Sequence, residues 1–322
     1  MADLELRPLG TTDAAAVLDL FRRWERYWKV PEISSLATVE EELTDPHFTP
    51  ELDSRGVWSG DRLVAFGSVG HIPSGERQEK AVIGGRVDPE MRGLGIGRRL
   101  LAWQIERGVE RLRECDPSIP WFIRAYEWDW ISDAHHLFSR FGLVPVRWFE
   151  DMVRPLSEPL DVATPEAVEI VGWEEVPTEE TRRVSNASFA DHWGSTPRDA
   201  EAWTHMLKGE GSRPDLSLVA VAEGQVIGVC LNFHYPQDEE VTGRIDGWIA
   251  HLGVVREWRR RGVAAALIAR SLESFREAGM THAMLGVDAD NPTGASGLYR
   301  RLGFETLHRT VTSEIQIRSR AD

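Results

Sequence analysis

The sequence predicts an α/β protein of the α+β kind that consists of two copies of one domain in tandem. Strand-like and helix-like segments follow the same order in both halves of the 322 residues. The first strands lie 164 residues apart, at Glu5 and Glu169, and two glycine-containing turns lie 167 residues apart, at Arg92 and Arg259. A domain of about 160 residues, used twice, therefore accounts for the whole length.

In the first half, alternating apolar residues predict a strand over 4–9. Capping residues at 11–13 begin a helix whose apolar side continues to 28, and a second helix, 35–43, ends before a proline at 46. A Gly-Asp turn joins a hairpin over 57–67. The other elements are a strand over 81–87, a helix that follows the first turn to about 114, a strand over 121–126, a short helix over 134–141 and a closing strand over 144–153.

The second half repeats this order. It reads as a strand over 168–173, helices over 178–189 and 196–207, a hairpin over 218–229, a strand over 248–254, a turn, a long helix, a strand that ends near 288 and a short helix that carries Tyr299. Proline and polar residues between the halves indicate a linker. The predicted organisation is a first domain at 1–156, a linker at 157–166 and a second domain at 167–322.

Composition excludes several classes of partner. The net charge is −15 and both halves are acidic, which argues against binding nucleic acid and suits either plain solubility or attraction of a cationic amine. No apolar run reaches eighteen residues, and the N-terminus lacks a secretory pattern, so we expect a cytoplasmic protein without a membrane partner. Cys115 and Cys230 are far apart, which predicts a reducing compartment and no cysteine zinc site, and we expect no metal. The sequence does not distinguish a monomer from a homodimer.

Each glycine turn has the features of a pyrophosphate-binding loop. The second glycine turn, Arg259–Ala264, connects an apolar strand to a long helix and has small residues at Gly262 and Ala264. The first glycine turn, Arg92–Gly97, has glycines at three positions. Small residues let the backbone N–H groups approach a phosphate, and a helix N-terminus adds partial positive charge.

Both turns resemble the Arg/Gln-x-x-Gly-x-Gly/Ala signature of the GCN5-related N-acetyltransferases. A strand valine, Val87 or Val254, precedes each turn by five residues, and the closing segments 137–143 and 298–304 share the family's pattern. The tandem layout, together with residues 286–291, is similar to that of mycothiol synthase, which acetylates a cysteinyl amine. The resemblance implies two acyl-CoA N-acyltransferase domains, each with a mixed, mostly antiparallel sheet whose central strands splay apart between flanking helices.

The resemblance also implies acetyl-CoA as the co-substrate. Its pantetheine arm is expected between the splayed strands and its pyrophosphate on the second glycine turn. The coenzyme-binding residues implied for the second domain are Leu252, Gly253, Val254, Arg259, Arg260, Arg261, Gly262, Val263, Ala264, Ala265 and Asn291. Those implied for the first domain are Val87, Arg92, Gly93, Leu94, Gly95, Ile96 and Gly97. The Val263 side chain is expected to be structural, and Arg259 and Arg260 are expected to add charge near the phosphates.

Catalysis is expected in the second domain. Acetyl transfer to an amine needs a proton for the departing thiolate, which the family often takes from a tyrosine on the last short helix. Tyr299 is at that position, whereas the first domain has Phe138 there, with His135 and His136 as an alternative proton donor. Asp246 is the predicted base, acting directly or through water. His251 is expected on the opposite face of the strand unless a bulge intervenes.

The acceptor pocket is predicted around the loop after the first helix of the second domain. Asp191 would pair with an ammonium group and Trp193 would stack over it, beside His192 and Phe233, although the same loop also suits a capping role. The predicted function is acetylation of a primary amine of a small molecule by direct attack. The alternatives are a mycothiol-synthase-like reaction on a cysteinyl amine, a non-catalytic acyl-CoA-binding sensor or scaffold, and an acetyltransferase for protein N-termini or lysines.

Overall fold

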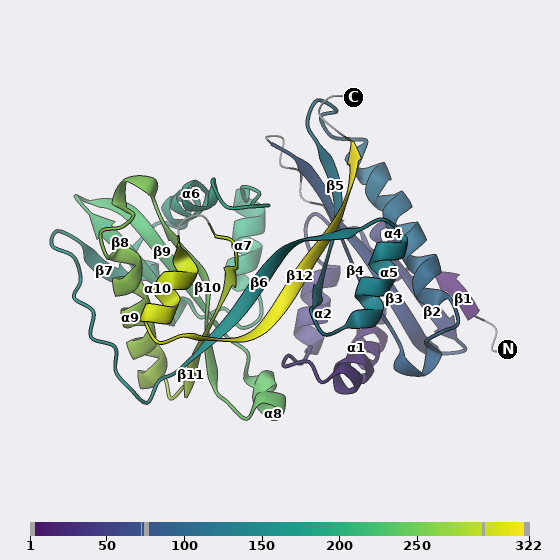
Figure 1. Ribbon diagram of the computed structural model, residues 1–322, viewed down its shortest axis with the longest axis horizontal. Helices are drawn as coiled ribbons and strands as arrows, with labels where there is room; N and C mark the ends of the chain where they lie inside the picture. Colours follow the sequence, from purple (N-terminus) through teal and green to yellow (C-terminus); the bar gives the residue numbers. More distant parts are fainter. Residues whose placement is uncertain (1–3, 72, 74–76, 292–293, 319–322) are drawn as a thin grey trace. The chain divides into compact units, whose positions relative to one another are not determined.

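The chain forms two compact units, unit 1 (Met1–Trp148 and Thr310–Asp322) and unit 2 (Phe149–Arg309). The computed structural model describes residues 4–71, 73, 77–291 and 294–318. Figure 1 shows the elements coloured along the chain. In these ranges no helix has both the length and the apolar character that crossing a bilayer requires.

The first half of the chain contains the elements predicted for it. Its helices are α1 (Ala14–Trp28), α2 (Leu36–Leu43), α3 (Pro50–Asp53), α4 (Ile96–Leu112) and α5 (Ser132–Arg140). The strands of this half are β1 (Leu4–Arg7), β2 (Ser54–Ser59), β3 (Arg62–His71), β4 (Glu79–Val87), β5 (Trp121–Trp128) and β6 (Val144–Pro155). The predicted Gly-Asp hairpin turn is confirmed, since Gly60 has a φ of 59° between β2 and β3.

The second half repeats the order. Its helices are α6 (Thr178–Phe189), α7 (Ala200–Lys208), α8 (Glu239–Thr242), α9 (Val263–Glu277) and α10 (Ala295–Arg301). Its strands are β7 (Glu169–Gly172), β8 (Leu218–Ala222), β9 (Gln225–His234), β10 (Asp246–Val254), β11 (His282–Asp288) and β12 (Glu305–Arg318). The second predicted helix begins at 200 rather than 196, because Asp199 caps it by accepting a hydrogen bond from the backbone N–H of Ala202.

The closing strands are exchanged between the two halves. The strand order is β1-β2-β3-β4-β5-β12 in unit 1 and β6-β11-β10-β9-β8-β7 in unit 2. From Thr310 on, β12 pairs antiparallel with β5, as Figure 1 shows, and from Phe149 on, β6 pairs antiparallel with β11. The predicted boundaries at 156 and 167 therefore differ from the structural ones. The sequence assigned each closing strand to the half that precedes it, whereas strand pairing assigns it to the other half.

Two layers of helices cover the sheet of unit 2. The α9 side chains pack with β10 and β11 in one hydrophobic cluster that includes Leu267, Ile249 and Leu285. On the other face, Val184 of α6 and Trp203 of α7 pack against β8 and β9. These two faces matter for the site, because a group between β10 and β11 would be reached from one face by α10 and from the other by α6.

Candidate active site

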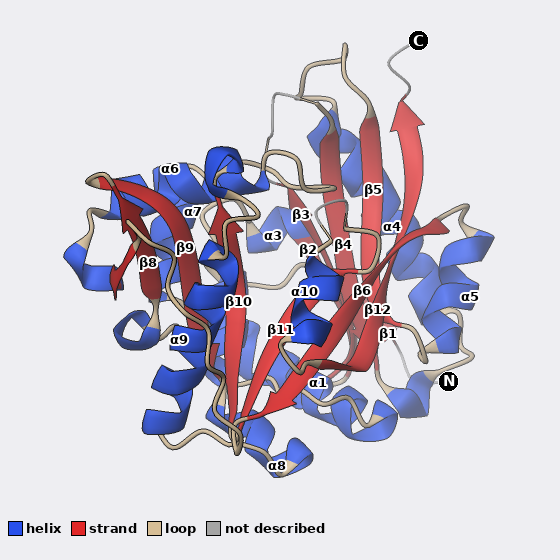
Figure 2. Ribbon diagram, turned by 60° about the vertical axis from the view of Figure 1, so that its left-hand side comes forward, coloured by secondary structure: helices blue, strands red, loops and turns tan. Residues whose placement is uncertain are grey.

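Strands β10 and β11 separate after four residues. They pair in parallel from Asp246–His282 to Ile249–Leu285, and the ladder then ends. Beyond it, Leu252, Gly253 and Val254 pair with β9 alone. Figure 2 shows the two strands close together at one end and diverging towards the other. Their open edge offers backbone N–H and C=O groups, as the predicted pantetheine site requires.

A β-bulge at Ala250 sets which side chains face the opening. The pairing of β10 with β9 shifts register between Ile249 and His251. A Cβ on Gly247 would lie 2.6 Å from the ring of Phe275 on α9, but one on Gly253 would lie 2.7 Å from Cβ of Ser188 on α6. Regular alternation would place Gly247 and Gly253 on the same face of the sheet. The bulge between them therefore reverses which residues of β10 face α6 and which face α9.

His251 is consequently on the α6 face, the outcome that the sequence allowed only with a bulge. Its ring stacks on Phe189 at 4.1 Å between centroids, and its Nε2 is hydrogen-bonded to Ser185 Oγ at 2.6 Å. Burial, Arg198 and His192 lower the pKa of His251 to about 3, so the imidazole is neutral at physiological pH. A neutral imidazole of such low basicity lines the site but is a poor proton acceptor.

The second glycine turn has the expected anion-binding geometry. Gly262 has a φ of 87° and precedes α9, whose first hydrogen bond runs from the N–H of Ala266 to the carbonyl of Gly262 at 3.0 Å. The N–H groups of residues 263–265 precede that bond and lack an intrahelical acceptor. The Val263 side chain is buried in the core, so its role is structural, as predicted.

The first glycine turn has the same form in unit 1. Gly93 and Gly95 have φ values of 79° and 78°, and a Cβ on either would meet nothing within 4 Å. Ile96 is buried and begins α4, while Leu94 is exposed. Gly97 is close to Val87 and to α5, where an added Cβ would lie 3.3 Å from Leu137. Both turns thus fit a pyrophosphate, with Arg260 (φ 60°) in unit 2 at the place of Gly93.

The leading arginine of each turn binds protein groups. Arg259 donates to the carbonyls of Val254 and Ser188, at 3.1 and 2.9 Å. Arg92 bonds to Tyr27 Oη and pairs with Asp133. The expectation that Arg259 adds charge at a phosphate is therefore corrected, because its guanidinium ties the end of β10 to α6. The exposed side chains in the second turn are those of Arg260 and Arg261.

Tyr299 lies beside the open edge of β10. It shares a buried cluster with Cys230 and Val254, and Cys230 pairs with Leu252 across β9 and β10. Burial, and to a smaller degree Cys230, raise the pKa of Tyr299 to about 12. The hydroxyl therefore stays protonated at neutral pH and has a proton to give. Phe138 packs in the core of unit 1.

Asp246 does not reach Tyr299. It lies at the first residue of β10, roughly 20 Å of strand from Leu252 at about 3.3 Å per residue. Both its oxygens are held by Arg244, at 3.1 and 2.8 Å. The alternation of side chains along a strand placed Asp246 on the same face as the expected base. It does not tell how far along the strand that residue lies from the reacting groups. Its predicted role as the base is thus replaced by a structural ion pair.

The predicted acceptor loop is only partly available to a ligand. Asp191 is paired with Arg256 at 2.9 Å and lies 3.5 Å from Arg259, and the Arg256 hydrogen bond lowers its pKa. This carboxylate already has cationic partners, which corrects its expected pairing with an ammonium group. Phe233 is a core residue in the cluster of Trp203, not a pocket wall. The side chains of His192 and Trp193 are half-buried. The ring centroids of Trp193 and Phe149 lie 6.4 Å apart.

Asp151 is the site residue that sequence reasoning missed. It pairs with Gly286, the first β11 residue beyond the ladder to β10, and a Cβ on Gly286 would lie 3.5 Å from Asp151 Oδ1. Its neighbour Met152 packs towards α9, so Asp151 projects to the opposite face, where Phe149 meets Trp193. Burial raises the pKa of Asp151 to about 6.

The exchange of closing strands explains why Asp151 was missed. The sequence placed residues 144–153 at the end of the first domain, whereas the structure assigns Asp151 to unit 2. We call the surface formed by Asp151, Ser188, His251 and Gly253 the acceptor face. Asn291 lies at the turn after β11, where its N–H donates to the carbonyl of Asp288 at 3.0 Å.

The equivalent surface in unit 1 is filled by side chains. Arg86 precedes Val87 as Gly253 precedes Val254, and its guanidinium lies 3.9 Å above the ring of Trp24. It also approaches Glu127 of β5 at 3.6 Å, across the gap that opens beyond Ile83. An arginine thus closes in unit 1 the opening that a glycine keeps in unit 2.

Gly253→Ala is expected to destabilise the protein by about 1–3 kcal/mol, because the added Cβ would lie 2.7 Å from Cβ of Ser188 and force β10 and α6 apart. Thermal unfolding measures the effect. Gly286→Ala is the matched control, since its Cβ meets Asp151 at an ordinary 3.5 Å. Equal unfolding temperatures for the two variants would contradict the close packing of Gly253 on α6.

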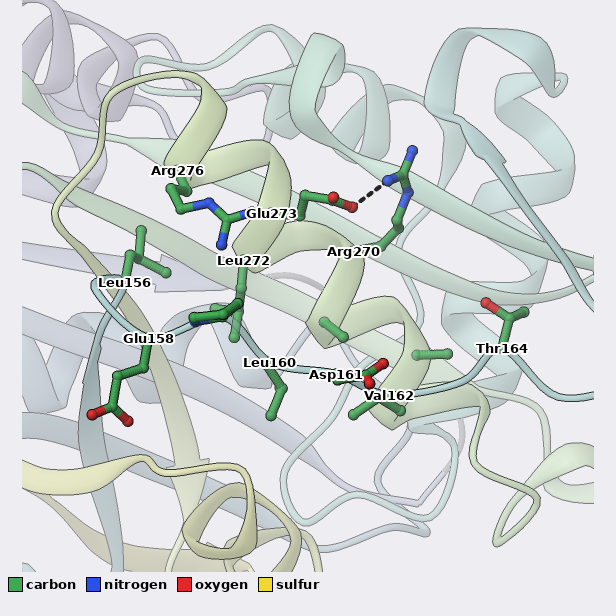
Figure 3. A pocket seen from close by; sticks show the side chains of 13 residues that line it. Leu156, Glu158, Leu160, Asp161, Val162, Thr164, Arg270, Leu272, Glu273 and Arg276 are labelled. Carbon is green, nitrogen blue, oxygen red and sulfur yellow. Dashed lines mark hydrogen bonds and ion pairs between the residues drawn. The ribbon is translucent and has the colours of Figure 1, made fainter.

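A separate cavity of about 300 Å³ lies between the chain segment 156–164 and α9 (Figure 3). Its walls include Leu160, Val162 and Leu272, and the ion pair of Arg270 with Glu273 lies on its rim. None of the predicted site residues lines it. We assign no catalytic role to this cavity, because neither Tyr299 nor the second glycine turn borders it.

Comparison with known proteins agrees with this geometry. The profile of the Acetyltransferase (GNAT) family matches residues 16–142 and 178–304. The chain is 30% identical to a mycothiol acetyltransferase of Thermobispora bispora over 256 residues, covering 77% of this chain and 78% of that protein. It is 31% identical to a mycothiol acetyltransferase of Streptomyces avermitilis over 264 residues, covering 78% and 76%.

Solved structures share the tandem fold. A GCN5-related N-acetyltransferase from Sphaerobacter thermophilus superposes with a TM-score of 0.74 at 27% identity, covering 98% of this chain and 96% of that one. A tandem GNAT protein from the clavulanic acid biosynthesis pathway superposes with a TM-score of 0.71 at 20% identity, and the match covers 98% of both chains. With both halves matched, the chain belongs to the GNAT acetyltransferase family, as a tandem-domain acetyl-CoA-dependent N-acetyltransferase.

Proposed function

We propose that unit 2 transfers the acetyl group of acetyl-CoA to a primary amine of a small molecule, and that unit 1 does not catalyse this reaction. The observation that carries the proposal is the arrangement around the open edge of β10. A protonated Tyr299 lies on the α10 side and a carboxylate, Asp151, on the acceptor face. Unit 1 has Phe138 at the position of Tyr299, and Arg86, at the position of Gly253, fills the equivalent face.

The coenzyme would be held mainly by backbone groups. The N–H groups of residues 263–265 suit the pyrophosphate, and the open edge from Leu252 to Val254 suits the amide groups of the pantetheine arm. Arg260 and Arg261, which are exposed, would add charge at the phosphates. Acetyl-CoA supplies an acyl thioester whose carbon is open to attack by an amine.

The two ionisable side chains then divide the proton transfers. Asp151 accepts a proton from the attacking amine through its carboxylate, and Tyr299 donates the proton on Oη to the departing thiolate. A base is most effective when its pKa is near the working pH, and burial raises the pKa of Asp151 to about 6. Arg244 holds Asp246, whereas burial is the cause of the raised pKa of Asp151.

Further features of the acceptor face bear on the acceptor's chemistry. Arg198 is half-buried with its pKa lowered by burial alone, and its charge helps lower the pKa of His251. Its guanidinium offers donors to oxygen atoms of an acceptor, while Asp151 suits the ammonium end. The rings of Phe189 and Trp193 suit an apolar part between them.

Relatives favour a cysteinyl amine as the acceptor group. Proteins named mycothiol acetyltransferase match about three quarters of this chain. We propose that the acceptor is a small oxygen-rich molecule whose primary amine belongs to a cysteinyl group. The first glycine turn would bind acetyl-CoA without turnover. The backbone of this turn has the complete anion-binding form, but unit 1 lacks the tyrosine that would act as the acid, and Arg86 fills its acceptor face.

The test is a competition among acceptors with acetyl-CoA in excess. The mixture of acceptors contains cysteinyl amines of amino sugars, simple aminoglycosides, polyamines and lysine peptides. Mass spectrometry follows the products, because the thiol of a cysteinyl acceptor would react with the reagent that detects released coenzyme A. We expect kcat/KM for the cysteinyl amine to exceed that for the lysine peptide by at least about 100-fold. Preference for the peptide would indicate a protein acetyltransferase, and absence of any product would favour the non-catalytic sensor.

A further inference from the structure

We propose that His71, Glu79 and Cys115 of unit 1 form a binding site for a thiophilic divalent cation, with Zn²⁺ the ion that suits this set of ligands. The three side chains come from the end of β3, the start of β4 and the segment after α4. Imidazole nitrogen, carboxylate oxygen and thiolate sulfur are each ligands that proteins use to bind zinc. The sequence predicted no metal, because residues 44 positions apart form no recognisable ligand spacing.

Two of the three distances between ligand atoms match a tetrahedral metal site. Nε2 of His71 lies 3.2 Å from Oε2 of Glu79 and 3.5 Å from Sγ of Cys115. Zinc bonds of about 2.0–2.3 Å at tetrahedral angles place neighbouring ligand atoms about 3.3–3.6 Å apart. All three atoms lie within 4.8 Å of one another. A single ion at their centre would therefore bind all three with only small movements of the side chains.

The same nitrogen of His71 faces both partners, and in either tautomer it can form a good hydrogen bond with only one of them. Nε2 carries either one proton or one lone pair. As a donor to Glu79 it cannot also accept from the thiol, and as an acceptor from the thiol it would face a carboxylate lone pair. A cation accepts electron pairs from all three atoms at once. Without a metal, the thiol can donate instead to the carbonyl oxygen of Arg111, 3.8 Å away, so a cation would replace these weak hydrogen bonds with three direct ligands.

Two of the three ligand side chains are buried, and a fourth coordination position remains for a ligand that the protein does not supply. His71 is 5% exposed and Glu79 is 1% exposed, while Cys115 is half-buried. Water or another small ligand can complete the coordination from the Cys115 side. Two charged neighbours influence the site, Glu114 favouring a cation and Arg111 opposing it, but the guanidinium of Arg111 also lies 3.9 Å from Asp53.

The proposed site is distinct from the acetyl-CoA sites. It lies at the start of β4, roughly 25 Å along the strand from Val87, which precedes the first glycine turn, at about 3.3 Å per residue. A bound ion would fasten the end of α4 to the β3–β4 pair. Because the thiolate is the ligand, Cys115 would lose its proton to solvent on binding. An ion that binds the folded chain alone stabilises unit 1.

The experiment uses the 322-residue chain freed of metal by a chelator and then given zinc alone. We expect one zinc per chain by elemental analysis, and a higher unfolding temperature than that of the metal-free protein. Cys115→Ser and Glu79→Gln should each weaken zinc binding by at least about tenfold. Cys230→Ser is the matched control, because it removes the other thiol from unit 2 and should leave the stoichiometry at one.

A measurement on the unaltered chain guards against variants that fail to fold. Zinc should protect Cys115 from alkylation, with peptide mapping to read Cys115 and the buried Cys230 separately. Cobalt in place of zinc should give a thiolate-to-metal absorption band that persists in Cys230→Ser and is lost in Cys115→Ser. Failure to bind zinc, alkylation of Cys115 that zinc does not slow, or unchanged binding in Cys115→Ser would overturn the proposal.

Discussion

Tyr299→Phe is expected to lower kcat by about 100-fold, with little change in the affinity for acetyl-CoA. The variant keeps the ring that packs with Cys230 and Val254 and removes only the hydroxyl. Because burial raises the pKa of Tyr299 to about 12, the hydroxyl holds its proton throughout the working range, and the phenylalanine ring has no proton to donate in its place. Steady-state rates and a separate coenzyme titration measure the two effects.

Two matched variants separate chemistry from packing. Tyr126→Phe removes a hydroxyl from an exposed position of unit 1 and should leave kcat unchanged. Phe138→Tyr supplies the missing hydroxyl to unit 1, yet Arg86 still covers the equivalent of the acceptor face, so we expect no gain in turnover. If Tyr299→Phe retains full turnover, the proton for the thiolate comes from another source and the assignment of Tyr299 is wrong.

Asp151→Asn is expected to lower kcat/KM at pH 7 by about 100-fold or more, because the amide cannot accept a proton from the attacking amine. The wild-type profile should fall on the acid side with an apparent pKa near 6, since burial raises the pKa of Asp151 to about 6 and only its ionised form is a base. In Asp151→Asn this acid limb should disappear. Rates measured from pH 5 to 9 with a fixed acceptor check the prediction.

The stability of the same variant should change in the opposite direction. The pKa of Asp151 is raised in the folded state, so protonation favours folding below about pH 6 and the ionised carboxylate costs stability above it. Replacement by asparagine should therefore stabilise the protein at pH 7 by about 1–2 kcal/mol, after allowance for the partly exposed side chain, and by less near pH 4. A variant that is both slower and more stable identifies a carboxylate retained for function.

Asp246→Asn provides the discriminating control. Its loss removes an ion pair with Arg244 at the far end of β10, so we expect lower stability with turnover changed only a few-fold. Abolished turnover in folded Asp246→Asn, together with an intact acid limb in Asp151→Asn, would restore Asp246 as the base and remove Asp151 from the mechanism.

Local features of the sequence predicted much of the fold. The glycine turns, the helices that follow them and the hairpin turn at Gly60 depend on residues near one another in the chain, and the structure contains each of them. The identification of two acetyl-CoA-binding folds rested on those turns. Tyr299 was proposed as the acid in the same way, because its helix follows β11 directly and ends in a recognisable pattern.

Contacts over long sequence distances were not predictable in this way. Asp191 was expected to be available to a ligand, but Arg256 and Arg259, more than sixty residues later, hold it. Phe233 and Asp246 were placed by alternation along a strand, which gives the face of a residue but not the neighbours that fill the space beside it. His251 depended on a single bulged residue whose presence leaves no mark in the sequence.

The sequence by itself thus determined the repeated domain, the two glycine turns and the tyrosine that distinguishes them, because turn and helix-end chemistry is local. Only the tertiary structure decided which strand completes which unit. Two closing strands of similar pattern can each pair with either copy of the same neighbour, and no local signal chooses between them. That choice brings Asp151 to the opening in unit 2 and gives the proposed active site its base.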